Sequence, residues 1–149
     1  MKFNANDVFL GINAKSVNSF LEKASEAAQS VGYTDNAKEL TQSFLNREKE
    51  FSTGLEDGFA IPHAKTNVVK KSGFLYFRLS EPLDWETYDD KPVTDVFTLM
   101  VPPENAGNEH LKMLANLSTA LLENDFKTGL RKLNSKEEIA DFINKQIGA

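Results

Sequence analysis

Two histidines and one arginine occupy positions in this chain that could support chemistry. His63 comes directly after Pro62, where a short apolar run from Phe59 is expected to end as a strand and a loop to begin. A side chain just beyond a strand end is held by the sheet yet open to solvent, and α/β folds often carry reactive groups there. With an ordinary pKa of about 6.5, its imidazole would be largely neutral at pH 7 and would offer a nucleophilic nitrogen.

His110 and Arg47 each occupy an unusual place in a helical pattern. Leucines follow His110 at helical spacing, so its imidazole lies on or near the core-facing stripe at the amino end of a predicted helix. The free amides and positive dipole of that end favour an anion such as phosphate. Arg47 continues the apolar line of Leu40 and Phe44, so its guanidinium could point into a pocket and hold an oxyanion.

Each of these residues also has an ordinary structural interpretation. A lone histidine is most often a surface residue or a satisfied structural one, and Glu109 with His110 could form a polar helix start. Arg47 could simply complement the helix dipole. Spacing alone does not show that the three residues meet. His63, His110 and Glu109 could also form a weak metal site of a hydrolase, although their spacing matches no known ligand pattern.

Composition and missing motifs exclude several classes of protein. The net charge of −5 argues against a general nucleic-acid binder, which would present a strongly basic face. The chain has no cysteine, which excludes disulfide scaffolds and thiol chemistry, and it has no P-loop, dinucleotide fingerprint or G-x-S-x-G elbow. No segment resembles a signal peptide or approaches the ~20 apolar residues of a membrane span. We therefore expect a soluble cytoplasmic protein with no metal and no bound cofactor.

The hydrophobic pattern predicts one α/β domain over residues 1–149, a sandwich in which helices flank a mixed central β-sheet. Strands are expected at residues 8–12, 59–62, 73–79 and 95–101. Helices are expected at residues 16–31 and 34–49 and from residues 108 and 135 onward, while residues 125–133 fit either a strand or a short helix. The second helix should be capped by Thr34 or Asp35. The third should bury Leu111, Leu114, Leu117, Leu121 and Leu122.

The stretch REKEFSTGLEDGFAIPHAK, residues 47–65, resembles the active-site signature of the IIA components of the bacterial sugar phosphotransferase system. The shared features are an Arg-Glu pair, a Thr-containing turn and a glycine-rich approach to Ala-Ile-Pro-His. NEHLKMLANLS, residues 108–118, is similar to the second histidine motif of the family, and residues 83–103 resemble the segment leading into its central strand. The branch is the fructose/mannitol one, which also contains nitrogen-regulatory IIA proteins.

This resemblance implies a role for each residue. His63 would be the phosphorylated nucleophile, taking a phosphoryl group from the carrier protein HPr and passing it to a IIB component, which serves a membrane IIC permease. His110 would orient the ring or hydrogen-bond the phosphoryl group, and Arg47 would stabilise its charge. In the alternative, nitrogen-regulatory type, the same phosphohistidine would be a switch for binding regulatory partners.

A few positions depart from the family pattern. Glu56 and Asp57 stand where relatives often have Gly-Asn, Ala64 stands where Gly is common, and Asp90 replaces a usual Gly in the turn before Pro92. Acidic side chains facing a phosphohistidine would repel the phosphoryl group. Glu56 and Asp57 are therefore expected to point outward.

Overall fold

The computed structural model describes residues 3–103 and 108–147, with residues 108–111 and 113 described by their backbone alone. The chain divides into two compact units. The larger runs from Phe9 to Asn105, and the smaller joins Met1–Val8 to Ala106–Ala149. No helix of the described residues is long and apolar enough to cross a membrane.

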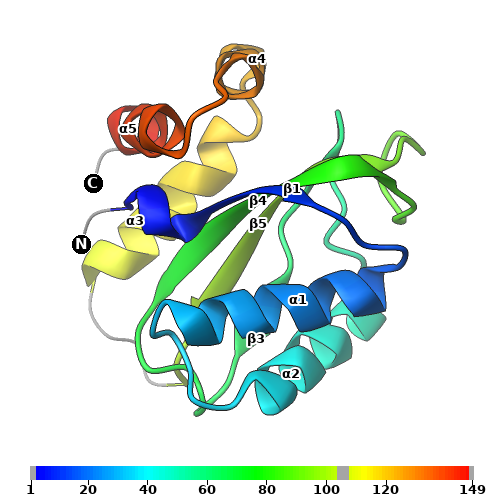
Figure 1. The fold of residues 1–149 in the computed structure, drawn as a ribbon, viewed down its shortest axis with the longest axis vertical. Helices are drawn as coiled ribbons and strands as arrows, with labels where there is room; N and C mark the ends of the chain where they lie inside the picture. Colours follow the sequence, from blue (N-terminus) through cyan, green and yellow to red (C-terminus); the bar gives the residue numbers. More distant parts are fainter. Residues whose placement is uncertain (1–2, 104–107, 148–149) are drawn as a thin grey trace. The chain divides into compact units, whose positions relative to one another are not determined.

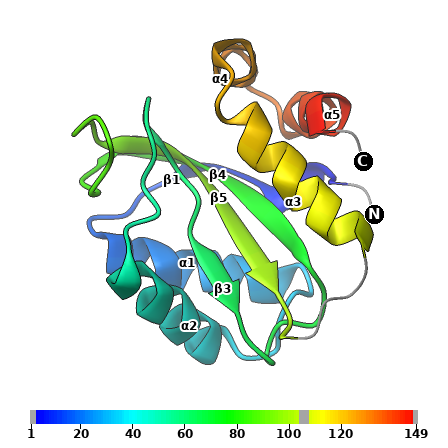
Figure 2. The same ribbon diagram turned by 180° about the vertical axis from the view of Figure 1, so that it is seen from behind.

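A mixed five-stranded sheet is organised around β5 (Val93–Val101). β4 (Gly73–Leu83) pairs with β5 in the antiparallel sense, and β1 (Val8–Ile12) lies beside β4. Two short strands, β2 (Phe59–Ala60) and β3 (His63–Lys65), both pair with β5 in the parallel sense. Figure 2 shows β3 beside β5. β5 is buried along nearly its whole length, as its continuous apolar sequence predicts for a central strand.

Two helices of the larger unit cover one face of the sheet, α1 (Val17–Ser30) and α2 (Ala37–Glu50) (Figure 1). α1 begins with a capping box, in which Ser16 accepts from the Ser19 amide at 3.0 Å and its own amide donates to the Ser19 hydroxyl at 3.2 Å. Gly32, with a φ of +89°, follows its carboxyl end. These local signals explain why the boundaries of α1 follow the sequence pattern closely.

The core of the larger unit lies between these two helices and the sheet. Its members come from both helices and from β4 and β5, and include Phe20, Phe44, Phe77, Val96 and Met100. The rings of Phe20 and Phe77 meet edge to face, with 5.3 Å between centroids, an arrangement that aromatic pairs prefer. This core fixes α2 against the sheet and thereby fixes the end of α2 that carries Arg47.

The smaller unit is helical. Its elements are η1 (Ala5–Asp7), α3 (Asn108–Ala120), α4 (Asn124–Lys132) and α5 (Lys136–Ile147). Phe126 of α4 stacks on Phe142 of α5 at 5.5 Å between ring centroids. Asn144 on α5 accepts from the amide of Phe3 and donates to its carbonyl, which ties the amino-terminal segment to α5.

The predicted α/β class, the mixed sheet and the central strand are confirmed, and helix α4 covers residues 125–132 of the ambiguous stretch, with Leu133 just beyond its end. Two predictions about the helices are wrong. Asn36 caps α2, because Thr34 is buried and its hydroxyl accepts from the Asn36 amide instead. Leu122 is 79% exposed, because α3 ends at Ala120 and Leu122 lies in the following turn.

Asp57 and Asp90 have left-handed backbone conformations, with φ of +57° and +60°. Among the described residues they are the only ones other than glycine with positive φ. Both stand where the sequence departs from its family resemblance, which favours Asn or Gly. Aspartate tolerates this conformation better than most residues, because its short polar side chain can bond locally, but it lacks the freedom of glycine.

We expect Asp90→Gly to stabilise the protein. Removing Cβ relieves the left-handed conformation, and this gain exceeds the extra entropy of the unfolded chain, so the free energy of unfolding should rise by about 0.5–1 kcal/mol. Chemical denaturation would measure it. Asp84→Gly is the matched control, because Asp84 is also exposed but has no positive φ, and it should give no gain. Equal effects of the two substitutions would contradict the explanation.

Candidate functional site

His63 begins a strand, so the expectation that it starts a loop is wrong. Pro62 lies between β2 and β3 and interrupts their pairing with β5. Its carbonyl nevertheless accepts a hydrogen bond from the Leu99 amide of β5 at 2.8 Å. His63 then pairs in register with Leu99 of β5. Parallel pairing resumes after the proline because both short strands lie against the same central strand. The half-buried imidazole is therefore carried by the sheet itself.

The loop before β2 is tied closely to the segment that leads to His63. The Ile61 amide donates to the Thr53 carbonyl at 3.0 Å, and the Ser52 hydroxyl donates to the Glu86 carbonyl at 2.6 Å. Between them, Gly54 comes so near the segment after β4 that a Cβ would lie 2.2 Å from the Glu86 carbonyl oxygen. Only glycine allows this approach, so the loop is packed between two parts of the fold.

Arg47 lies in the last turn of α2, which packs against β3. Its Nη1 donates to the Phe51 carbonyl at 2.9 Å, so it partly serves the helix end, as the structural interpretation expected. Its positive charge also lowers the pKa of His63, because a nearby cation disfavours the imidazolium. The structure thus brings the charge of Arg47 within electrostatic reach of His63, while its role in holding an oxyanion stays a prediction.

Glu48 joins the site without having been predicted as a site residue from the sequence. Its carboxylate accepts from the Thr53 amide at 2.8 Å, the Thr53 hydroxyl at 2.7 Å and the Trp85 indole at 2.9 Å. Its negative charge raises the pKa of His63. One sequence signal could have indicated it: an acidic residue in the last turn of a helix, where the dipole disfavours a negative charge.

The net effect of these surroundings is a lowered pKa for His63. Burial is the largest cause and the charge of Arg47 the second, while the Ile61 backbone and the charge of Glu48 act in the opposite direction. The ring is therefore neutral at pH 7. Its Nδ1 is buried and has no hydrogen-bond partner among the described residues.

The remaining residues singled out in the sequence are His110 with Glu109, and Glu56 with Asp57. His110 lies in the first turn of α3, but its side chain and that of Glu109 are outside the described set, so their roles stay predictions. Glu56 is exposed and Asp57 is half-buried. Within the part of the chain that is described, no three His, Asp or Glu side chains form a group that could hold a metal ion.

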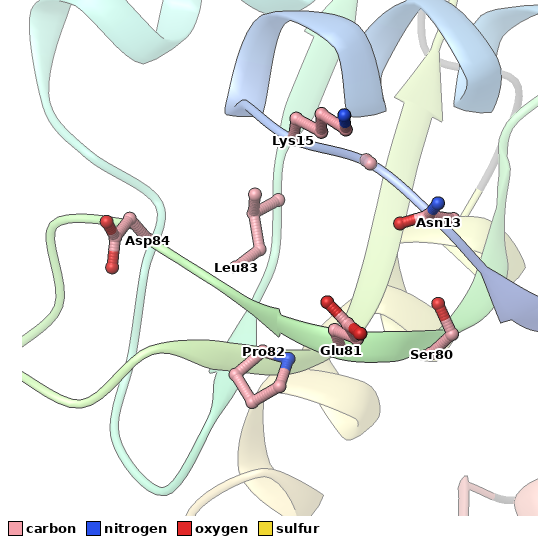
Figure 3. Close-up of a pocket in the computed structure, with 8 residues that line it drawn as sticks. Asn13, Lys15, Ser80, Glu81, Pro82, Leu83 and Asp84 are labelled. Atoms are coloured by element: carbon pink, nitrogen blue, oxygen red, sulfur yellow. The ribbon is translucent and has the colours of Figure 1, made fainter.

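A separate pocket of about 470 Å³ lies where the segment after β1 passes the end of β4 (Figure 3). Its lining is mostly polar and includes Asn13, Lys15, Ser80 and Glu81. Neither His63 nor Arg47 lines it, so this pocket is not part of the site around the imidazole.

The sequence model of the family described as "Phosphoenolpyruvate-dependent sugar phosphotransferase system, EIIA 2" matches residues 1–146, and the chain belongs to this family. It is 34% identical over 118 residues to a fructose-specific EIIA component of Haloferax volcanii, spanning 79% of this chain and 76% of that one. It is 36% identical over 130 residues to a nitrogen regulatory protein of Bradyrhizobium diazoefficiens, spanning 87% and 82%.

Longer relatives and solved structures agree with this membership. The chain is 32% identical over 136 residues to the fructose-specific EIIABC component of Bacillus subtilis; the match covers 91% of this chain but only 21% of that protein's length. The crystal structure of the nitrogen regulatory protein IIA-Ntr from Neisseria meningitidis superimposes with a TM-score of 0.81 at 29% identity, covering 93% of this chain and 94% of that one. IIA mannitol from Escherichia coli gives a TM-score of 0.76 at 25% identity, covering 96% and 99%.

We predict that Arg47→Gln raises the pKa of His63. The substitution removes the cation that disfavours the imidazolium and leaves burial unchanged. Ring resonances followed by NMR across a pH series would measure the shift. Lys49→Gln removes the same charge from an exposed position in the same turn and should leave the pKa of His63 in place. A pKa that falls or stays constant in Arg47→Gln would contradict the placement of the guanidinium.

Proposed function

We propose that this protein is the phosphoryl-carrier IIA component of a phosphoenolpyruvate-dependent sugar phosphotransferase system, with His63 as the phosphorylated residue. It would accept the phosphoryl group from phosphorylated HPr in the cytoplasm and pass it to a IIB component, which serves a membrane IIC permease. One observation carries the proposal: in a chain of the EIIA 2 family, a neutral, half-buried imidazole is held by the sheet within reach of an arginine.

The chemistry follows from the surroundings of the ring. Because Nδ1 is buried, we infer that Nε2 attacks the phosphorus of the donor phosphohistidine. A new N–P bond forms as the N–P bond of the donor breaks, and the donor ring keeps that electron pair. A protonated ring would have no free pair with which to attack, so the lowered pKa of His63 keeps the nucleophile available.

Positioning and electrostatics supply most of the catalysis in such a transfer. The transition state is loose, with negative charge spread over the phosphoryl oxygens. Arg47 would offset part of this charge, and the sheet would hold the ring in line with the donor. We keep the proposal that His110 binds the phosphoryl group or orients the ring. Its place in the first turn of α3 supports this, because helix amino ends favour anions.

We also propose that residues 1–149 act as one EIIA domain.

Phosphorylation by phosphoenolpyruvate, enzyme I and HPr should add one acid-labile, base-stable phosphoryl group, detected by mass spectrometry. His63→Ala should abolish the addition, because it removes the accepting nitrogen. His110→Ala should slow the transfer more than it lowers the free energy of unfolding. Phosphate that survives His63→Ala would refute the assignment of His63. An unfolded His110→Ala variant would make that residue structural.

The similarity to nitrogen regulatory proteins of Bradyrhizobium diazoefficiens and Neisseria meningitidis favours a second candidate function. In it, phosphorylation of His63 would switch the binding of regulatory partners, and the phosphoryl group would not be passed to sugar. Both functions use the same chemistry at the imidazole, so only the acceptor distinguishes them.

Transfer from the phosphorylated protein to a purified IIB component tests this difference. We expect the phosphoryl group to move to IIB within the time that HPr takes to phosphorylate His63. The decisive measurement is the loss of phosphate from this chain with its matching appearance on IIB. A chain that is phosphorylated normally but transfers to none of a panel of fructose- and mannitol-type IIB components would favour the regulatory function.

A further inference from the structure

We propose that Glu48 is a positioning residue for phosphoryl transfer at His63. Its carboxylate joins the loop before β2 and the indole of Trp85 to the end of α2, and so holds the backbone that carries the imidazole. The proposal rests on the proposed function of His63, and it adds a residue whose role is distinct from that of Arg47.

The place of Glu48 in its helix is unfavourable by itself. It lies in the last turn of α2 between Arg47 and Lys49, the two basic residues of that turn. Cations complement the negative end of the helix dipole, whereas a carboxylate is disfavoured there. A residue that conflicts with its local element in this way is expected to be compensated by contacts elsewhere in the fold.

Those contacts are three hydrogen bonds from two buried residues. Oε2 accepts from the Thr53 amide at 2.8 Å and from the Trp85 indole at 2.9 Å, and Oε1 accepts from the Thr53 hydroxyl at 2.7 Å. Thr53 is 4% exposed and Trp85 is 9% exposed. Buried donors are costly to leave unpaired, and bonds to a charged acceptor are stronger than neutral ones. The carboxylate therefore fixes both residues relative to α2.

The bonds to Thr53 lead directly to His63. The Thr53 carbonyl accepts from the Ile61 amide at 3.0 Å, two residues before the imidazole. Pro62 follows with a fixed φ, and its carbonyl is held by Leu99 of β5. A shift of Thr53 would thus move the segment that enters β3. Trp85 joins Glu48 to the hydrophobic core, because its ring contacts that of Phe20 at 6.1 Å between centroids.

The charge of Glu48 acts on the same ring. Among the residues whose side chains are described, Arg47, the Ile61 backbone and Glu48 act on the pKa of His63 besides burial, and the charge of Glu48 raises it. A more basic imidazole is a better nucleophile as long as it stays neutral. Negative charge near the bound phosphoryl group would also make the group easier to pass on.

Two substitutions separate geometry from charge. Glu48→Gln can keep the network: its amide oxygen can take the place of Oε2, while its amide nitrogen donates to the Thr53 hydroxyl. Glu48→Ala loses both the bonds and the charge. Glu50→Gln is the control, since Glu50 is exposed and lies in the same turn, and its substitution removes an equal charge.

We expect Glu48→Ala to slow phosphorylation of His63 by HPr about 10- to 100-fold, because small displacements of a nucleophile cost that much. Glu48→Gln should recover most of the rate lost in Glu48→Ala while lowering the pKa of His63 in an NMR titration. Glu50→Gln should match the wild type in both measurements. Single-turnover rates at saturating donor would separate positioning from weaker docking of HPr.

Several outcomes would overturn the proposal. One is a wild-type rate in Glu48→Ala. Another is an unchanged pKa of His63 in Glu48→Gln together with a rate no better than that of Glu48→Ala. If Glu48→Ala does not fold, Thr53→Val replaces it: the variant keeps the backbone amide but loses the hydroxyl donor, and an unchanged rate would refute the role of the network. Failure of the wild type to be phosphorylated would instead refute the proposed function.

Discussion

The position of His63 depends on the pairing of two very short strands with one stretch of β5. β2 has two residues and β3 has three, so neither could keep its direction alone. Pro62 between them has no amide hydrogen to donate, yet its carbonyl accepts from Leu99 and carries the ladder across the break. Because β5 is buried and pairs with β4 as well as with β2 and β3, the imidazole is held by the central strand of the sheet.

The short strands β2 and β3 need support beyond their pairing with β5, and the closely packed loop before β2 supplies it. An exposed loop of this length would ordinarily be among the least stable parts of a fold. Here Glu48 holds Thr53, and Gly54 lets the loop approach the Glu86 carbonyl more closely than any other residue could. The loop thus acts as a support for the strand that follows it, and the α2 end that contributes Arg47 is part of the same support.

Sequence patterns predict those features that are decided locally. The start of α1 at Ser16 and its end near Gly32 follow from capping chemistry, and β5 follows from a continuous apolar run. The strand at His63 could not be predicted in this way, because three residues have no periodicity of their own and the strand exists only through pairing with β5. The unfavourable place of Glu48 in its helix is a local signal, but its hydrogen-bond partners could not be predicted, because Trp85 lies 37 residues away in the chain.

A phosphoryl carrier must release its group as readily as it accepts it, and this requirement gives a reason for opposite charges beside one imidazole. Arg47 alone would both depress the basicity of the ring and hold the phosphoryl group. Its guanidinium is shared with the Phe51 carbonyl, and Glu48 acts on the ring in the opposite sense. An interaction that stabilised the phosphorylated state without stabilising the transition state would slow the next transfer. Both charges come from the last turn of α2, so under the proposed function one helix end would set the balance between accepting the group and passing it on.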